Sequence, residues 1–544
     1  KSPEQFKLIG KYDRRLDAQQ KVDGTSVFGI DVQREGMVHA VLVRCPHFGG
    51  TLKSFDASAS KQIAGVSDIF ALGAAVAIIA SGYWPARKAA QALTVEWDKG
   101  PLAGLDSAGI RAALKKQLDE GEAHNVTDEG KAPGGDTTGL NTQIIEAEYY
   151  APYQAHAAME PLNCVADVRT DRVDIWTGNQ SPDIFRATVA DALQRPRESV
   201  FIHTPMLGGG FGRRAFPDYA IEAALLSHRT GRPVKLIWSR EDDMRHDYYR
   251  PAALSRFRAY LQDGKLVGWE NKVTGPSIMQ AMIPMAVNTM VGWIPERPLQ
   301  ALGNLMAIRD SLSTEGAAKL AYATPYLKVD YTLFNPGIPI GSWRSVGHSF
   351  NGYFVESFFD EIAHALKQDP LAFRLAQLKP EATRARAVLE LAAAKAGWGK
   401  APAGRFQGLA VHEAFDTLVA EVAEISIEGS QIKVHKVTCA VECGRVVNPD
   451  IVAMQIESGV IYALSAAVNG EITIEDGAVK QGNFNDFAVV RMQDAPAIEV
   501  HIVPSDAEPT GVGEPGVPPL AAAVGNAIFA ATGKRLRELP FRLA

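Results

Sequence analysis

The sequence has few cysteines, no excess of basic residues and no long apolar run. Four cysteines among 544 residues are too few for a disulfide framework. The net charge of −6 argues against the basic surface of a protein that binds nucleic acid or anionic membranes. The apolar run at residues 71–80 is far shorter than the roughly 20 residues that cross a bilayer. We therefore expect no transmembrane segment and no nucleic-acid partner.

Motifs of several common enzyme classes are also missing. The twelve histidines include no His-Glu-x-x-His pair, which argues against a zinc protease. The stretch 347–352 is one residue too long for the Gly-x-Ser-x-Gly elbow of serine hydrolases. Residues 511–516 formally match Gly-x-Gly-x-x-Gly, but the chain ends 28 residues later, too soon for a dinucleotide-binding βαβ unit.

The cysteine pair Cys439 and Cys443 is the only metal-like spacing. Residues 433–442 have the pattern of a strand, and a separation of four places both thiols on one face. No second pair or histidine cluster completes a metal site, so we interpret them as buried structural thiols and predict no protein ligand to a metal.

The alternation of predicted helices and strands indicates an α+β (mixed α/β) fold of two or more domains. Helices and strands interleave without a regular βαβ rhythm. We predict strands at 27–31, 38–44, 74–80, 94–97, 172–177 and 234–239, and helices at 85–93, 218–228, 354–366, 448–466 and 519–532, with another from Pro370.

The acidic, glycine-rich stretch 116–142 is the best candidate for a domain boundary. We predict a small domain at 21–115, a solvated linker at 116–142 and a large domain at 143–544. The two paired strands 27–31 and 38–44, with Gly36 at the turn, would open the small domain.

The most informative residue is Glu514, a lone carboxylate in a loop made almost wholly of glycine and proline, 508–519. Glycine and proline have the widest and the narrowest backbone freedom, so such a loop can take an unusual path and hold it. We interpret Glu514, next to Gly513, as a catalytic base.

A second signal is Gly208-Gly209-Gly210-Phe211-Gly212, followed by Arg213 and Arg214. Successive glycines let backbone N–H groups face a ligand without an intervening Cβ. The two arginines suit an anion, although a tight turn explains the glycines equally well.

Two further residues are candidates on weaker grounds. Arg344, between small residues, could bind an oxyanion in a fork or could form a structural ion pair. Gln180, at the end of a predicted strand, could face a ligand, although a role in the turn is the simpler interpretation.

The ordered set of motifs resembles the large subunit of the molybdenum hydroxylases, the xanthine dehydrogenase/aldehyde oxidase family, most of all its isoquinoline-oxidising members. Residues 24–31 and 82–84 are similar to its a/b hammerhead domain. The cofactor-binding part is represented, in order, by 159–161, 176–182, 208–212, 343–347, 455–459, 483–492 and 511–519.

The resemblance implies a molybdenum ion held by a pterin dithiolene, in bacteria usually the molybdopterin cytosine dinucleotide. It also implies a small partner subunit with two [2Fe–2S] clusters, and in some relatives a cytochrome c subunit. By position, Glu514 matches the catalytic base of the family, and Gln180 matches the amide that faces an oxygen on molybdenum. Arg344 matches an arginine in the loop that borders the metal site. The loops at the cofactor are matched by Gly513 and by residues 209–212, which are Gly209, Gly210, Phe211 and Gly212.

The resemblance also implies the reaction. A water-derived oxygen is inserted at an electron-poor carbon of an N-heteroaromatic or an aldehyde, with hydride transfer to molybdenum. Purine-hydroxylating members carry a glutamate and an aromatic residue where this chain has Ala215 and Val346. We therefore expect a substrate other than xanthine, and a bacterial protein of either the periplasm or the cytoplasm.

One motif of the family is absent: no Gly-Gln-Gly of the pterin loop occurs in the sequence. We expect that loop to lie in an N-terminal segment that precedes this chain or on another chain. The absence leaves open a rival interpretation, a non-catalytic scaffold or cofactor-carrier subunit, against which the retained Glu514 argues.

Overall fold

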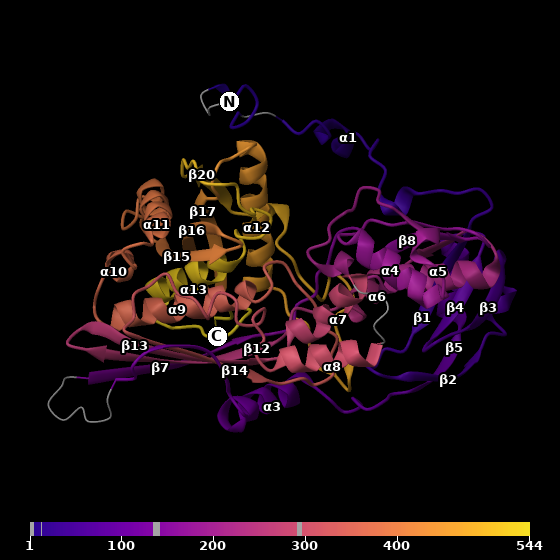
Figure 1. Ribbon diagram of the computed structural model, residues 1–544, viewed down its shortest axis with the longest axis horizontal. Coiled ribbons are helices and arrows are strands. Elements are labelled where there is room, and N and C mark those ends of the chain that lie inside the picture. The colour runs from indigo at the N-terminus through magenta and orange to yellow at the C-terminus, as the bar shows by residue number, and fades with distance from the viewer. Residues whose placement is uncertain (1–4, 12–13, 134–141, 291–295, 544) are drawn as a thin grey trace.

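The computed structural model describes residues 5–11, 14–133, 142–290 and 296–543. It is a mixed α/β structure built on three sheets (Figure 1). In order across each sheet, the first contains β10 (Val200–His203), β9 (Val173–Trp176), β8 (Asn163–Val168), β11 (Val234–Ile237), β1 (Val38–Arg44), β4 (Ala75–Ala80) and β3 (Val66–Leu72). The second contains β6 (His124–Gly130), β14 (Tyr326–Leu333), β13 (Lys265–Gly275), β12 (Ala253–Gln262) and β7 (Thr142–Ala151). The third contains β15 (Phe406–Ala414), β16 (Thr417–Glu428), β17 (Gln431–Glu442) and β20 (Ala497–Ile502).

The seven-stranded sheet is covered by helices on both faces. Alternate residues of β1 and β4 point to opposite sides, as the pleat requires. One set packs with helices α4 (Pro182–Leu193) and α5 (Asp218–Thr230). The other set packs with α2 (Tyr83–Ala92). A small two-stranded sheet of β2 (Thr51–Asp56) and β5 (Thr94–Asp98) lies beside them.

The other two sheets enclose a helical layer. Helix α9 (His348–Ala365) packs on β7 and β12, and α13 (Pro518–Thr532) packs on β15 and β16. The two helices also pack against each other, between the sheets in Figure 1. This contact is tight, because a Cβ on Gly352 would lie 2.8 Å from the Cβ of Pro518. The N-termini of α9 and α13 are therefore held side by side.

The remaining helices lie around these layers. They are α1 (Ala18–Val22), α3 (Ser107–Glu120), α6 (Arg240–Arg245), α7 (Ile278–Met290), α8 (Glu296–Ala307), α10 (Pro370–Gln377), α11 (Thr383–Ala396) and α12 (Pro449–Val468). A short pair, β18 (Ile474–Glu475) and β19 (Ala478–Val479), completes the strands.

Helix boundaries follow the signals in the sequence. The Asn448 side chain accepts a hydrogen bond from the Ile451 amide at 3.2 Å and caps α12. Helix α13 begins at Pro518 and ends at Gly533, which has the positive φ of 68° that favours glycine. These caps confirm the predicted starts of both helices to within a residue or two.

Two predictions about the N-terminal part were wrong. Residues 27–31 are not a strand paired with β1: Gly29–Asp31 is a 3-10 turn, and Phe28 makes only an isolated bridge to Met206. The stretch 116–142 is not an unstructured linker, because α3 runs to Glu120 and β6 joins the five-stranded sheet. The acidic residues of α3 suggested a solvated segment, but Ile110, Leu114 and Leu118 on its other face are buried. Residues 134–141 of that stretch lie outside the described residues.

The predicted domain boundaries stay a prediction, but one sheet spans the expected division. Strand β1 pairs in parallel with β11, which lies far beyond the predicted linker. A hydrogen-bonded sheet therefore joins the expected small domain to the large one.

Helix α12 is, among the described residues, the one helix long and apolar enough to cross a membrane. Its contacts are those of a core helix: it packs against α13, β17 and β20, and 44% of its most apolar stretch is buried inside the protein. Length and composition alone are weak grounds for a span.

Candidate active site

Four loops lie close together, and each follows or precedes a helix or strand. Residues 177–181 and 204–212 follow β9 and β10, which are neighbours in the seven-stranded sheet. Residues 341–347 and 509–517 precede α9 and α13, whose N-termini are held together. Strand order and helix packing thus bring together segments that are far apart in the sequence.

Glu514 is half-buried and held by the loop before α9. The backbone amide of Ser345 donates to Oε1 of Glu514 at 3.0 Å, and the Ser345 hydroxyl donates to the Glu514 carbonyl oxygen at 2.8 Å. No hydrogen bond to Oε2 is found within the described part of the chain. The carboxylate is therefore fixed by one oxygen while the other is left to accept a proton.

Arg344 braces the same two loops. Its guanidinium donates to the carbonyl oxygen of Gly513 at 2.8 Å, to the hydroxyl of Ser458 at 3.0 Å and to the backbone oxygen of Gln455 at 3.2 Å. It is 5% exposed, and burial lowers its pKa. The sequence suggested either a structural ion pair or an oxyanion site for Arg344. Arg344 pairs with no carboxylate among the described residues, and its guanidinium N–H groups donate to backbone and side-chain oxygens of the protein itself.

The triple-glycine loop lies against Gln180. Oε1 of Gln180 accepts from the Gly212 amide at 3.1 Å, and a Cβ on Gly210 would lie 2.4 Å from that same oxygen. Gly212 has φ 109°, and a Cβ on it would lie 1.6 Å from the carbonyl oxygen of Ser342. Only glycine fits at Gly212, so the loop is pressed between Gln180 and the loop before α9.

The amide orientation of Gln180 follows from this contact. Because Oε1 accepts from Gly212, Nε2 is turned away and can donate. Among the described residues Nε2 has no hydrogen-bond partner, and the residue is exposed. The structure thus leaves one free amide donor beside the glycine loop.

The expectation that Arg213 and Arg214 face an anion was wrong. They are 2% and 0% exposed. Arg213 pairs with Asp218 and Asp247, and Arg214 pairs with Glu160 at 3.0 Å. Both arginines lie on a short 3-10 turn, and their side chains are buried beneath the glycine loop. Their ion pairs hold the loop from below.

Glu160 is the centre of that support and was missed as a site residue. It accepts from the Gly208 amide at 2.7 Å and from the Ile30 amide at 3.0 Å. Arg214 in turn donates to the carbonyl oxygen of Gly209 at 2.8 Å. The motif that contains Glu160 was recognised in the sequence, but its partners come from two other segments, the turn at Ile30 and residues 208–214.

Backbone strain is concentrated in these loops. Phe211, Ser345 and Val346 have φ values of 54°, 75° and 48°, in the region that side chains other than glycine avoid. Such residues cost on the order of 1–3 kcal/mol each and persist where the surroundings impose them. Strain of this kind is common at active sites.

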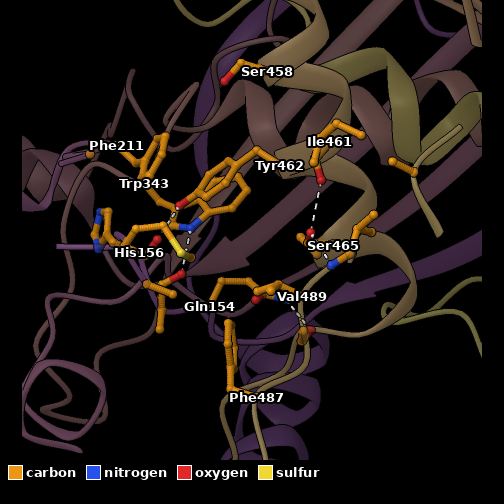
Figure 2. Close-up of a pocket in the computed structure, with 18 of the residues that line it drawn as sticks. Gln154, His156, Phe211, Trp343, Ser458, Ile461, Tyr462, Ser465, Phe487 and Val489 are labelled. Carbon is orange, nitrogen blue, oxygen red and sulfur yellow. Dashed lines mark hydrogen bonds between the residues drawn. The ribbon is translucent and has the colours of Figure 1, made fainter. Parts of the chain in front are cut away.

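A cavity of about 820 Å³ lies next to the glycine loop. Figure 2 shows Phe211, Trp343 and Tyr462 grouped on one side of it, with Gln154 and Phe487 opposite. Tyr462 stacks between Phe211 and Trp343, with ring centroids 4.4 Å and 4.6 Å apart. Helix α12 and residues 487–498 close the remaining wall.

Some of the predicted site residues line this cavity, and the others lie outside it. Gly209 and Phe211 line the cavity, as does Trp343 of the neighbouring loop. Glu514, Gly513, Arg344, Gln180 and Val346 do not line it, although they contact the loops that do. Ala215 ends the 3-10 turn under the loop, and no described contact joins it to Glu514.

The cavity fits a bound organic cofactor in size and lining. Small-molecule sites are typically about 300–1,000 Å³ and mostly apolar with a few polar groups. Glycines at 208 and 209 expose backbone along one side, where Gly209 has φ 101°. Flat aromatic surface is available from Tyr462 and its neighbours for a fused ring system.

Comparison with known proteins gives the family. Two sequence profiles described as the molybdopterin cofactor-binding domain match residues 120–289 and 367–496, together more than half of the chain. The chain belongs to the molybdenum hydroxylase family. It is a catalytic subunit of that family of oxidoreductases, and the cavity lies in its molybdopterin-binding part. Gln180 and the glycine loop fall inside the first match, whereas Arg344 and Glu514 fall outside both.

Named relatives are oxidoreductases, and the second of them carries pyrroloquinoline quinone in its name. The chain is 29% identical to the isoquinoline 1-oxidoreductase subunit beta of Brevundimonas diminuta, over 99% of this chain and 69% of that protein. It is 29% identical to a membrane-bound aldehyde dehydrogenase of Gluconacetobacter polyoxogenes, over 99% of this chain and 72% of that protein. Quinoline 2-oxidoreductase of Pseudomonas putida 86 has the same fold, with a TM-score of 0.80 at 15% identity, covering 98% of this chain and 97% of that one.

The cysteines take no part in the site. All four are buried, and burial raises the pKa of Cys439 and of Cys443. The described residues contain no group of three or more His, Cys, Asp or Glu side chains placed to hold a metal.

Proposed function

We propose that the chain oxidises an electron-poor carbon of an N-heteroaromatic compound or an aldehyde, with Glu514 as the base. The observation that carries the proposal is the fixation of Glu514 by Ser345, at 3.0 Å through Oε1, beside the strained loop that also borders the cofactor cavity. A carboxylate so fixed can take a proton at Oε2 from a reacting oxygen within hydrogen-bond reach.

The cofactor is molybdopterin, which we propose to be the cytosine dinucleotide form. Gly209 and Phe211 would border it from the glycine loop, and Tyr462 would present its ring from α12. When bound, the molybdenum centre supplies the two-electron oxidising power and the activated water-derived oxygen for hydroxylation. Nε2 of Gln180, which has no partner among the described residues, would donate a hydrogen bond to the bound cofactor.

Glu514 is held in place by backbone groups of two segments. The residue lies just before α13, whose N-terminal backbone amides present partial positive charge. The Ser345 amide adds a direct hydrogen bond to the carboxylate. The Ser345 contact fixes the direction in which the carboxylate points.

The relatives and the residues Val346 and Ala215 support a proposal for the substrate class. An aliphatic Val346 and a methyl group at Ala215 leave no side-chain carboxylate or ring at the positions that hold purines in other members. We therefore propose isoquinoline-like heterocycles or aldehydes. Electrons would leave through a small [2Fe–2S] subunit, and from there to an acceptor such as a cytochrome c subunit.

The proposal is tested on the native complex, purified with every polypeptide that accompanies the chain. We expect molybdenum in metal analysis, cytidine monophosphate after acid hydrolysis of the pterin, and dye-linked oxidation of isoquinoline or benzaldehyde. Molybdenum without turnover on a panel of both substrate classes would support the scaffold or cofactor-carrier alternative and contradict the proposal.

A further inference from the structure

Three ionisable side chains form a contact chain behind the loop that holds Glu514. Nε2 of His348 lies 3.8 Å from Oε2 of Glu315, and Nδ1 of His348 lies 2.8 Å from Nε2 of His412. The three residues come from a turn before β14, the first position of α9 and strand β15. The proposed reaction has not used any of them.

This cluster begins next to the base. The loop amide of Ser345 binds Glu514, and the backbone of Gly347 hydrogen-bonds Glu315, so one loop contacts the two carboxylates on either side of Val346. Two residues of chain span at most about 7 Å. Burial, followed by the negative charges of Asp310 and Glu514, raises the pKa of Glu315 to about 7. The two carboxylates therefore influence each other across Val346.

Glu315 is incompletely satisfied. Its Oε2 is buried and has no hydrogen-bond partner. That oxygen faces His348, and their separation of 3.8 Å is slightly longer than a hydrogen bond. A small rotation of either side chain, or one water molecule, would connect them. A carboxyl group with a pKa of about 7 holds and releases a proton with equal ease near neutral pH.

The two histidines continue the path. Burial lowers the pKa of His348 to about 4 and lowers that of His412 as well, so both rings are neutral at pH 7. A neutral imidazole can receive a proton at one ring nitrogen and release one from the other. The contact of 2.8 Å between the rings is a hydrogen bond of ordinary length.

The path ends at His412, which is buried but lies beside a small cavity. His412 lines a small cavity of about 40 Å³ whose wall also includes Lys319 and Glu413. Lys319 is exposed and Glu413 half-buried. This cavity places the last histidine of the path next to side chains that reach solvent.

We propose that Glu315, His348 and His412 carry protons from Glu514 to the surface. The inference rests on the proposed function, because hydroxylation of a C–H bond by water releases two electrons and two protons. The electrons pass to the partner subunit or to a dye. One proton is left on Glu514, which must lose it before the next turnover.

The transfer steps balance as follows. Glu514 gives its proton to Glu315; Oε2 of Glu315 gives one to Nε2 of His348. Nδ1 of His348 gives one to Nε2 of His412, and Nδ1 of His412 releases one to water or buffer. One proton has then moved along the path, and each histidine is left as its other neutral tautomer until its ring rotates or the protons hop back between the ring nitrogens. The charged or titratable groups that face the path are Asp310 and Glu514 at Glu315, and the two histidines at each other.

The test uses His412→Gln in the assembled enzyme, because His412 is the member farthest from Glu514. We expect kcat in dilute buffer to fall about tenfold or more, while the rate of the first reduction by substrate, measured without an electron acceptor, is unchanged. Imidazole added as a small proton carrier should restore kcat. The control is His435→Gln. His435 lies on strand β17, hydrogen-bonds Ser426 and takes no part in the proposed proton path.

Three results would overturn the proposal. They are an unchanged kcat, an equal fall of kcat and the first-turnover rate, and a fall of kcat without rescue by imidazole. If His412→Gln does not fold, Glu315→Gln is measured in the same way.

A second readout does not depend on activity. In chain labelled with ¹⁵N-histidine, Glu315→Gln should shift the ring signals of both His348 and His412 and leave His435 unchanged. If neither ring responds, the path is broken and the proposal fails. If the wild-type enzyme turns over no substrate, that result counts against the proposed function. The ring signals of His348 and His412 then still test whether the proton path exists.

Discussion

Ser345 holds Glu514 twice: its amide binds Oε1 of the carboxylate at 3.0 Å, and its hydroxyl binds the carbonyl oxygen of the same residue at 2.8 Å. The contact exists because α9 and α13 pack against each other at their N-termini, where Gly352 meets Pro518. Ser345 has a strained φ of 75°, and this backbone conformation directs its amide toward the carboxylate. The base is thus positioned by helix packing rather than by its own loop alone.

Replacement of Gly212 should be severely destabilising. A Cβ there would lie 1.6 Å from the Ser342 carbonyl oxygen, at a φ of 109° that side chains avoid. We expect Gly212→Ala to lower the free energy of unfolding by about 2–4 kcal/mol and to reduce molybdenum content. Thermal unfolding and metal analysis of the purified complex measure the two effects.

Gly513→Ala is the matched control, because nothing lies within 4 Å of the added Cβ and φ is ordinary. It should change the unfolding free energy by less than about 1 kcal/mol. Equal destabilisation by the two substitutions would show that the close approach of Gly212 and Ser342 does not exist.

Arg344→Lys should separate the two loops from α12. Lysine cannot reproduce the fork that reaches the Gly513 carbonyl and Ser458 together, so buried acceptors lose donors. We expect a loss of about 1–3 kcal/mol in stability and a fall in kcat, because Glu514 follows Gly513 directly. Urea unfolding and steady-state kinetics check this; wild-type values for both would refute the bracing role.

The stability of the protein should depend on the ionisation of Glu315. Its pKa rises from the ordinary 4.5 to about 7 in the folded protein, mainly through burial. Between these pH values the folded state keeps a proton that the unfolded chain has lost, so the free energy of unfolding falls as the pH rises from 4.5 to 7.

Glu315→Gln should remove this fall. Above pH 7 the variant should gain about 1–2 kcal/mol relative to the wild type, after allowance for the partial exposure of the carboxyl. The difference between the two unfolding curves, measured from pH 4.5 to 8, isolates Glu315 from other groups. A difference that does not change with pH would contradict the raised pKa.

Local signals in the sequence predicted the helices well. Asn448, Pro518 and Gly533 mark helix ends by chemistry that needs no tertiary contact. The segment 27–31 failed for the opposite reason: its alternating pattern suggested a strand, but the sheet position beside β1 is taken by β11 from a distant part of the chain.

The site was predicted only as far as short motifs carried it. The glycine loop, Gln180 and the loop of Glu514 are recognisable because glycine and proline mark unusual backbone shapes locally. The inward turn of Arg213 and Arg214 and the contact of Glu315 with His348 depend on which distant elements pack together. No spacing in the sequence records such contacts.

The central claim is that Glu514 is the base, and Glu514→Gln tests it most directly. Glutamine preserves shape and can keep the Ser345 contact but cannot take the proton. We predict full molybdenum content with turnover of isoquinoline or benzaldehyde reduced about 10²–10⁴-fold, whereas Glu508→Gln, an exposed residue of the same loop, should leave turnover unchanged. Turnover by Glu514→Gln within a few-fold of the wild type, with molybdenum retained, would contradict the account.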